Sequence, residues 1–129
     1  MKLRDIHQRV MPEDLESELR RLCLHLETSQ GQLRSAGLYY AKKESAYRKA
    51  KAVAQLKADG KTVDDRKAQV DRDCGEERLT AYLARAAKEA ALENVRSIRA
   101  QLSALQSIAA SVRSEMELAG APQPRWSNG

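Results

Sequence analysis

Apolar residues recur at alternating steps of four and three in the first half of the chain. The residues with this spacing are Leu15, Leu19, Leu22, Leu26 and Leu33, with Ser29 at one position. Residues three and four apart share one face of an α-helix, so the pattern predicts a helix with one apolar stripe. Pro12 suits a first helical position, and acidic residues follow it. The stripe continues through Tyr40 and Tyr47, so we expect one helix from Pro12 to about Ala58.

A second long helix is predicted from Glu76 to Leu118, where neither glycine nor proline interrupts the chain. Steps of four and three connect Ala91, Val95, Ile98, Leu102, Leu105, Ala109, Val112 and Met116. An upstream set has the same spacing one residue out of phase: Leu79, Leu83, Ala86 and Ala90. We interpret the change of phase near Ala90 as a local stutter in one apolar stripe.

The segment Asp59–Thr62 is expected to be the turn between the two helices. Gly60 is suited to a left-handed cap, and either Thr62 or Asp64 can cap the next helix. A break at Cys74-Gly75 would leave a short helix over about 63–73. The turn at 59–62 is short, so we expect the helices on either side of it to be antiparallel neighbours.

The sequence therefore predicts an all-α fold, an elongated helical hairpin with coiled-coil-like packing. We divide the chain into an N-terminal arm (1–11), a hairpin domain (12–118, turn near 59–62) and a flexible tail (119–129) that holds Trp126. Gly120 and Pro122 are expected to end the last helix. Because each helix of a hairpin has only one partner, we expect a homo-oligomer. The residues assigned to subunit contacts are Val95, Ile98, Leu102, Leu105, Ala109, Val112 and Met116.

Composition supports long helices and argues against several function classes. The 129 residues are 32% charged and 4% aromatic, with no Phe. No apolar run approaches the roughly 20 residues of a membrane span, so we expect a soluble cytoplasmic protein, in the host-cell cytoplasm if the chain is phage-encoded. We find no phosphate-binding loop, nucleophile elbow or zinc-protease motif, and we expect neither an enzyme nor a cofactor.

The two cysteines are far apart, which argues for a reducing compartment. Cys23 lies among leucines and is expected to pack as a small apolar side chain, whereas Cys74 lies in a polar stretch and is expected to be exposed. The two histidines do not combine with the cysteines at a metal-binding spacing, so no metal site is expected.

The most basic stretch is 34–57, with seven Lys and Arg, one Glu and a local balance of +6 against +5 for the whole chain. On a helical wheel the apolar arc contains Tyr39, Tyr40, Ala46, Tyr47, Ala50, Val53 and Ala54. The opposite arc contains Arg34, Lys42, Arg48, Lys49 and Lys51. Lys43 falls among the apolar positions, and Lys57 lies at their edge. The basic arc is either a solvated charged face or a surface for a polyanion.

Two functions fit this stretch. The first is binding of single-stranded nucleic acid, in which cations follow the phosphates and the tyrosines either stack on bases or, as we favour, pack in the stripe. The second is a structural role as a phage assembly or adaptor coiled coil that does not bind DNA, in which the apolar stripe is the functional surface.

The opening Met1-Lys2-Leu3-Arg4-Asp5-Ile6 is similar to the Met-Arg-Leu-Glu-Asp-Leu opening of phage recombination mediator proteins of the UvsY type. The order of features is also similar: a Leu-Tyr pair at Leu38-Tyr39, a Lys/Ala-rich helix ending at Gly60, an acidic linker and a long C-terminal helix. A family Lys-x-Arg motif would fall on Ala52 and Ala54, so the implied DNA contacts move to nearby cations.

This resemblance implies a helical protein that forms rings, with a heptamer as the candidate, and binds single-stranded DNA. Its partners would be a RecA-like recombinase and the single-strand binding protein that the recombinase replaces. The candidate DNA-binding residues are Arg34, Lys42, Lys43, Arg48, Lys49, Lys51 and Lys57.

Overall fold

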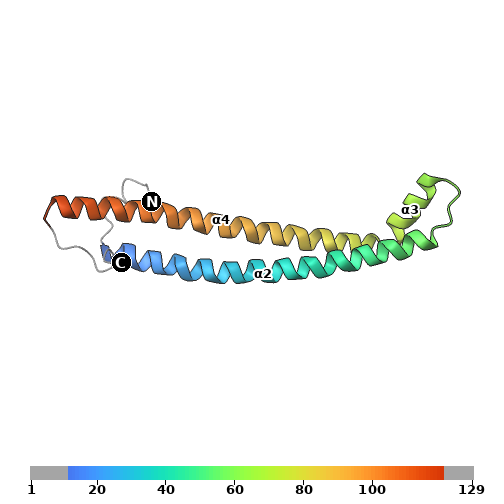
Figure 1. The fold of residues 1–129 in the computed structure, drawn as a ribbon, viewed down its shortest axis with the longest axis horizontal. Helices are drawn as coiled ribbons and strands as arrows, with labels where there is room; N and C mark the ends of the chain where they lie inside the picture. Colours follow the sequence, from blue (N-terminus) through green and yellow to red (C-terminus); the bar gives the residue numbers. More distant parts are fainter. Residues whose placement is uncertain (1–11, 121–129) are drawn as a thin grey trace. The chain divides into compact units, whose positions relative to one another are not determined.

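A computed structural model of the chain describes residues 12–120. Within that range there are three α-helices and no strand: α2 (Pro12–Lys57), α3 (Val63–Asp73) and α4 (Gly75–Leu118), shown in Figure 1. The predicted all-α class and the helix bounds are confirmed for this part of the chain. The arm 1–11, with the opening that carries the family resemblance, and Trp126 lie outside the described residues.

Local sequence signals explain where the helices begin and end. Glu13 and Asp14 occupy the first turn of α2, where negative charge offsets the helix dipole. The hydroxyl of Thr62 accepts a hydrogen bond of 3.0 Å from the backbone N–H of Asp65, which makes Thr62 the N-cap of α3. Gly120 has a φ of 70°, so α4 ends with a glycine in the left-handed conformation, as predicted.

The predicted left-handed cap at Gly60 is wrong, because Gly120 is the one glycine with positive φ between residues 12 and 120. Glycine is needed at position 60 for a different reason. A Cβ atom there would lie 2.8 Å from the Cβ of Asp65 and 3.0 Å from the backbone N of Arg66. The chain approaches the start of α3 too closely for a side chain.

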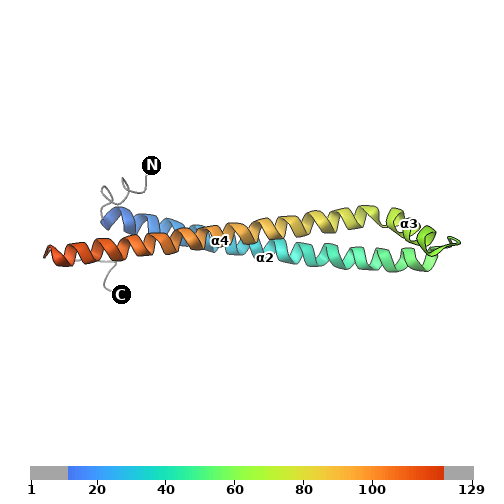
Figure 2. The ribbon, with the colours of Figure 1, turned by 90° about the horizontal axis from the view of Figure 1, so that it is seen from above.

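The chain divides into two compact units, each containing a segment of α2 and a segment of α4. Unit 1 consists of Met1–Ser29 and Asn94–Gly129, and unit 2 is Gln30–Glu93. Within each unit the α2 and α4 segments lie side by side and antiparallel (Figures 1 and 2). This pairing is what a helical hairpin requires.

Unit 1 has a core of large aliphatic side chains, as the leucine stripe predicts. Leu15 packs with Ala109 and Val112, and Leu22 packs with Ile98 and Leu102. Burying a side chain of this size stabilises a fold by about 1.5–3 kcal/mol. The polar position of the stripe is also filled: Ser29 is buried and accepts a hydrogen bond of 3.1 Å from Asn94 Nδ2.

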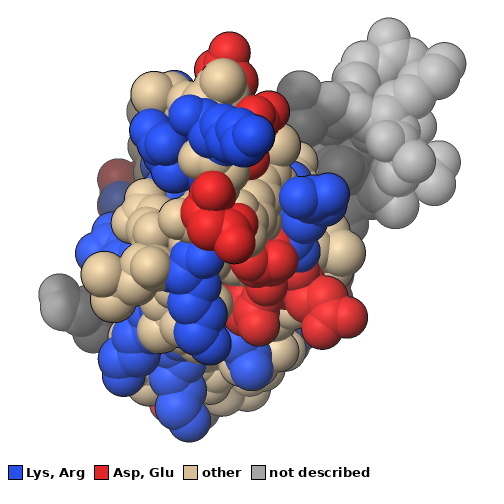
Figure 3. All heavy atoms as spheres, turned by 90° about the vertical axis from the view of Figure 1, so that its right-hand side faces the viewer, with Lys and Arg blue, Asp and Glu red and all other residues tan. Residues whose placement is uncertain are grey.

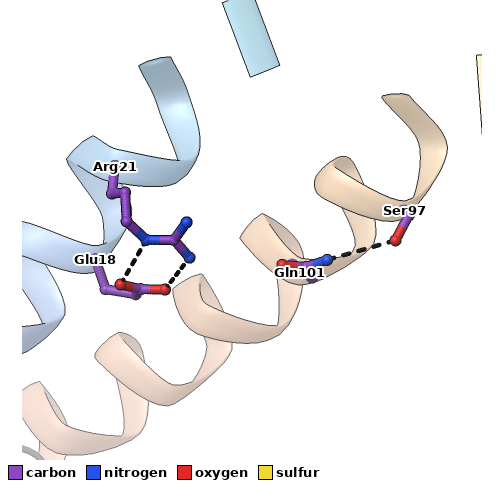
Figure 4. Close-up of polar contacts among 4 residues, drawn as sticks. All are labelled: Glu18, Arg21, Ser97 and Gln101. Carbon is purple, nitrogen blue, oxygen red and sulfur yellow. Dashed lines mark hydrogen bonds and ion pairs between the residues drawn. The ribbon is translucent and has the colours of Figure 1, made fainter. Parts of the chain in front are cut away.

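Polar pairs within single helices cover the outside of unit 1 (Figure 4). Arg21 donates two hydrogen bonds to the Glu18 carboxylate, one turn earlier on α2, and Gln101 Nε2 lies 3.4 Å from Ser97 Oγ on α4. The hydrogen bond from Arg21 and its charge lower the pKa of Glu18, although slight burial acts in the opposite direction. Such exposed pairs add little to stability.

The core of unit 2 is smaller and depends on α3. Ala54 of α2 packs with Val70 of α3 and with Cys74, the residue between α3 and α4, and Tyr47 and Ala50 cover this cluster. Because α3 folds back onto the end of α2, Cys74 is only 1% exposed, and its thiol donates to the carbonyl of Val70 at 3.0 Å.

Both cysteine predictions are therefore wrong. Cys74 is buried because the polar residues around it point outward from α3 and α4, while its own position faces α2. Cys23 is exposed because it lies one residue beyond the buried Leu22, outside the apolar stripe of α2. Residues adjacent in sequence point to different sides of a helix, so the polarity of sequence neighbours does not predict whether a residue is buried.

The predicted stutter in α4 is also wrong. The positions that face α2 keep steps of four and three without interruption from unit 2 into unit 1: Ala81, Ala84, Lys88, Ala91, Val95, Ile98 and Leu102 are all buried or half-buried. The set that includes Leu79 and Leu83 is instead a second stripe, exposed on the opposite side of α4. We call it the outer stripe, and it consists of Leu79, Tyr82, Leu83, Ala86 and Ala90.

Across residues 12–120, none of the helices combines the length and apolar composition needed to cross a bilayer.

Candidate nucleic-acid interface

The predicted DNA-binding residues all lie on the α2 segment of unit 2, and six of the seven are exposed. We call the exposed six the basic face: Arg34, Lys42, Arg48, Lys49, Lys51 and Lys57. Arg34, Lys42, Arg48 and Lys49 lie on the side of α2 opposite Tyr47 and Ala54, which pack in the core of unit 2, whereas Lys51 lines a groove against α3. The helix therefore displays four of these cations on one side, and Lys51 and Lys57 lie nearer its buried side.

The basic face is only partly neutralised by nearby groups. Arg48 Nε lies 3.2 Å from a carboxylate oxygen of Glu44, one turn earlier, so part of its charge is balanced. For Lys42 and Lys49, no ion pair is found with any residue between 12 and 120. These two lysines are seven residues apart and share one side of the helix.

Exposed apolar side chains lie between the cations. Leu38, Val53 and Leu56 are all exposed. Leu38 precedes Lys42 by four residues and Leu56 follows Lys49 by seven, so all four share one side of α2. This side of α2 therefore combines two cations with two exposed leucines.

The tyrosines divide between packing and exposure. Tyr47 packs against the core of unit 2, as we favoured, and the half-buried Tyr40 lies under Lys88, whose Nζ is 5.4 Å from the ring centroid. Tyr39 is 52% exposed, and Lys43 Nζ lies 5.2 Å from its ring centroid. Lys43 is thus half-buried and is the one candidate that does not belong to the basic face.

A groove between α2 and α3 adds two cations that the sequence did not indicate. It has a volume of about 410 Å³ and brings together Lys51 of α2 with Arg66 and Lys67 of α3. Arg66 and Lys67 lie in a stretch of the sequence that is acidic overall, which is why they were missed. A helical wheel of 63–73 would have shown that Val63, Arg66, Lys67 and Val70 share one side of α3.

Figure 3 views the end of unit 2 that contains α3. Lysine and arginine side chains prevail along the lower left of this face, and aspartate and glutamate side chains gather across its middle. Asp64 and Asp65 lie in the first turn of α3.

The outer stripe lies on the side of unit 2 opposite Lys42 and Lys49, since both are turned away from the contact between α2 and α4. Leu79, Tyr82 and Leu83 are all more than half exposed. Exposed apolar side chains gathered in this way are typical of surfaces that bind another protein.

The residues that the sequence assigned to subunit contacts already have a partner within the chain. Val95, Ile98, Leu102, Leu105, Ala109, Val112 and Met116 are buried or half-buried in unit 1, where α4 faces α2. Their assignment to contacts between subunits stays a prediction, and the structure offers the outer stripe as another surface for that role.

Within residues 12–120, no three His, Cys, Asp or Glu side chains gather as metal ligands would. No protein-family model, curated protein or solved structure matches this chain.

Proposed function

We propose that unit 2 binds single-stranded DNA along the basic face of α2. In a cell the chain would act as a recombination mediator, which helps a RecA-like recombinase to replace single-strand binding protein on DNA. The mechanism has no chemical step. The protein holds the strand in a shape that favours nucleation of the recombinase filament.

The observation that carries this proposal is the mixture of cations and apolar side chains on one exposed side of α2. Lys42 and Lys49 supply positive charge, and Leu38 and Leu56 are exposed beside them. Neutralising phosphates releases counterions and gives salt-dependent affinity, and stacking of bases on aromatic side chains needs no particular sequence. Both properties suit a protein that acts on any single strand.

Self-association through the outer stripe would strengthen such binding. A single basic face of six cations binds weakly, but an oligomer repeats the face and raises the affinity through avidity. Contacts through the outer stripe would leave Lys42 and Lys49 accessible, because these lysines lie on the opposite side of unit 2. A ring is one way to arrange the copies.

The second candidate is an assembly or adaptor coiled coil that does not bind DNA, and the outer stripe favours it as well. In that case Leu79 and Leu83 would meet another coiled-coil protein, and the lysines would serve solubility alone.

Retardation of a labelled oligo-dT separates the two candidates. A mediator retards the oligonucleotide at about 100 mM salt and releases it at several hundred millimolar. Mass in solution, measured by light scattering with and without oligo-dT, shows whether the bound form is an oligomer. A protein that is oligomeric but leaves oligo-dT unretarded at about 50 mM salt would be the adaptor instead.

A further inference from the structure

Three cations from two helices, Lys51 of α2 with Arg66 and Lys67 of α3, face the groove between α2 and α3. We propose that it binds one nucleotide of the strand, with the phosphate on Lys51, Arg66 and Lys67 and the base against Val63 and Val70. This inference rests on the proposed function and adds to the basic face a site on a second helix.

The cations reach the groove from both of its walls. Lys51 belongs to α2, and Arg66 and Lys67 belong to the first half of α3. Arg66 Nη1 donates a hydrogen bond of 3.0 Å to the carbonyl of Gly60, which fixes the guanidinium but uses only one of its five N–H groups. Its remaining donors are available to a phosphate.

One acid lines the groove, and it is partly balanced. An Asp71 carboxylate oxygen lies 4.0 Å from Arg78 Nη1. The cavity therefore has three cations against one carboxylate that already has a cationic neighbour. An anion is the ligand that this charge distribution favours.

The apolar part of the lining distinguishes a nucleotide from a bare anion. Val70, in the second half of α3, is buried. Val63, the first residue of α3, is 58% exposed. Gln55 adds an amide that can pair with a base edge. The volume of about 410 Å³ falls within the range of about 300–1,000 Å³ that is common for small-molecule sites.

The other side of α3 provides an internal comparison. A second groove there is lined by Asp59, Asp65 and Arg72, so two acids oppose one cation. Lys67 and Arg72 are both exposed, carry the same charge and lie five residues apart on the same short helix. Replacing either by alanine removes one positive charge from α3, but only Lys67 lines the proposed site.

The first test is the salt dependence of oligo-dT binding by the full chain. Each phosphate contact contributes about 0.7 to the slope of log affinity against log salt for a single strand. Lys67→Ala is expected to reduce the slope by about 0.7 and Arg72→Ala to leave it unchanged. Equal slopes for the two variants would overturn the phosphate part of the proposal.

The second test uses methyl NMR to detect the base. Oligo-dT is expected to shift the Val63 and Val70 methyl signals through the ring current of the base, whereas Val112 in unit 1 does not move. Inorganic polyphosphate, which has no base, is expected to leave both groove valines near their original positions. Equal shifts from the two ligands would show a bare anion site, and no shift from oligo-dT would show an empty groove.

The outcomes distinguish this inference from the function on which it rests. If the wild-type protein does not bind oligo-dT at about 50 mM salt, both fail together. If binding is intact and weakens on replacement of Lys42 and Lys49, but Lys67→Ala behaves like Arg72→Ala, the function stands and the groove proposal alone is wrong.

Discussion

Unit 1 and unit 2 each contain a segment of α2 and a segment of α4. Different side chains fill the contact between these two helices in the two units. In unit 1 the facing positions are filled by large aliphatic residues such as Leu22 and Ile98, which are fully buried. In unit 2 they are filled by alanine, tyrosine and lysine, with Ala84 on α4 and Tyr47 and Lys43 on α2. The facing positions have the same spacing in both units, but the side chains at those positions differ in size and polarity.

The exposed surfaces of the two units also differ, because unit 2, which has the smaller core, exposes more large apolar side chains. Of the large apolar side chains that are exposed between residues 12 and 120, all but Leu24 and Leu118 lie in unit 2. Unit 2 also holds the whole basic face. The difference indicates that unit 1 supplies most of the folding free energy, while unit 2 presents surfaces to other molecules.

Leucine truncations test this division with the largest expected effect. Leu22→Ala should lower the free energy of unfolding by about 2–5 kcal/mol, because the side chain is 1% exposed and leaves a cavity in unit 1. Leu24→Ala, two residues away and 66% exposed, is the matched control and should change it by less than about 0.5 kcal/mol. Urea unfolding followed by circular dichroism measures both, and similar values would show that unit 1 is not the stable core.

Two glycines in unit 2 provide the next test. Gly60→Ala should lower the free energy of unfolding by about 1–3 kcal/mol, because the new Cβ would clash with the backbone at Arg66. Gly37→Ala should raise it by about 0.5–1 kcal/mol, since no atom lies within 4 Å and alanine favours the helix. The same unfolding measurement applies. A stabilised Gly60→Ala variant would mean that the turn before α3 is looser than described.

The two cysteines compare local opening of unit 2 with global unfolding. Exposed Cys23 should react with a thiol reagent at the rate of an unfolded chain, and buried Cys74 at least about tenfold more slowly. We expect the opening free energy from Cys74 labelling, measured in a Cys23→Ser variant, to be smaller than the global value. If the opening free energy at Cys74 equalled the global free energy of unfolding, the two units would open together. Unit 2 would then not be the less stable of the two.

The smallest expected effect is the pH dependence of the Glu18–Arg21 pair in unit 1. The hydrogen bond from Arg21 lowers the pKa of Glu18, so its stabilisation is fully present above the usual glutamate pKa and is lost as pH falls through the lowered one. Comparing the wild type with Glu18→Gln should therefore show a small difference at pH 7 that disappears in acid. A difference that grows in acid would mean that folding does not lower the pKa of Glu18.

The helices could be predicted from the sequence because their apolar stripes are long and proline is scarce, although Gly31 and Gly37 lie inside α2. Thr62 and Gly120 cap helices for the reasons that their residue types suggest. The leucine stripe of α2 likewise predicted the core of unit 1, because a heptad pattern of large apolar residues has one good way to be buried.

The sequence was a weaker guide where a position has two possible partners. Leu79 and Leu83 have the spacing of a core stripe, but alanines on the opposite side of α4 face α2 instead. Only the contact between helices decides which stripe is inside. The burial of Cys74 and the site formed by Lys51, Arg66 and Lys67 depend in the same way on α3 folding back, a tertiary event with no local signal.

Binding of single-stranded DNA along the basic face is tested by comparing the salt slope of oligo-dT binding for two charge-matched variants. Lys42→Ala/Lys49→Ala removes two cations from the basic face of unit 2, and Arg20→Ala/Arg99→Ala removes two exposed arginines from unit 1. The slope is expected to fall by about 1.4 for the first variant, at about 0.7 per phosphate contact, and to stay unchanged for the second. Equal losses in both variants, or no loss in the first, would contradict binding along the basic face.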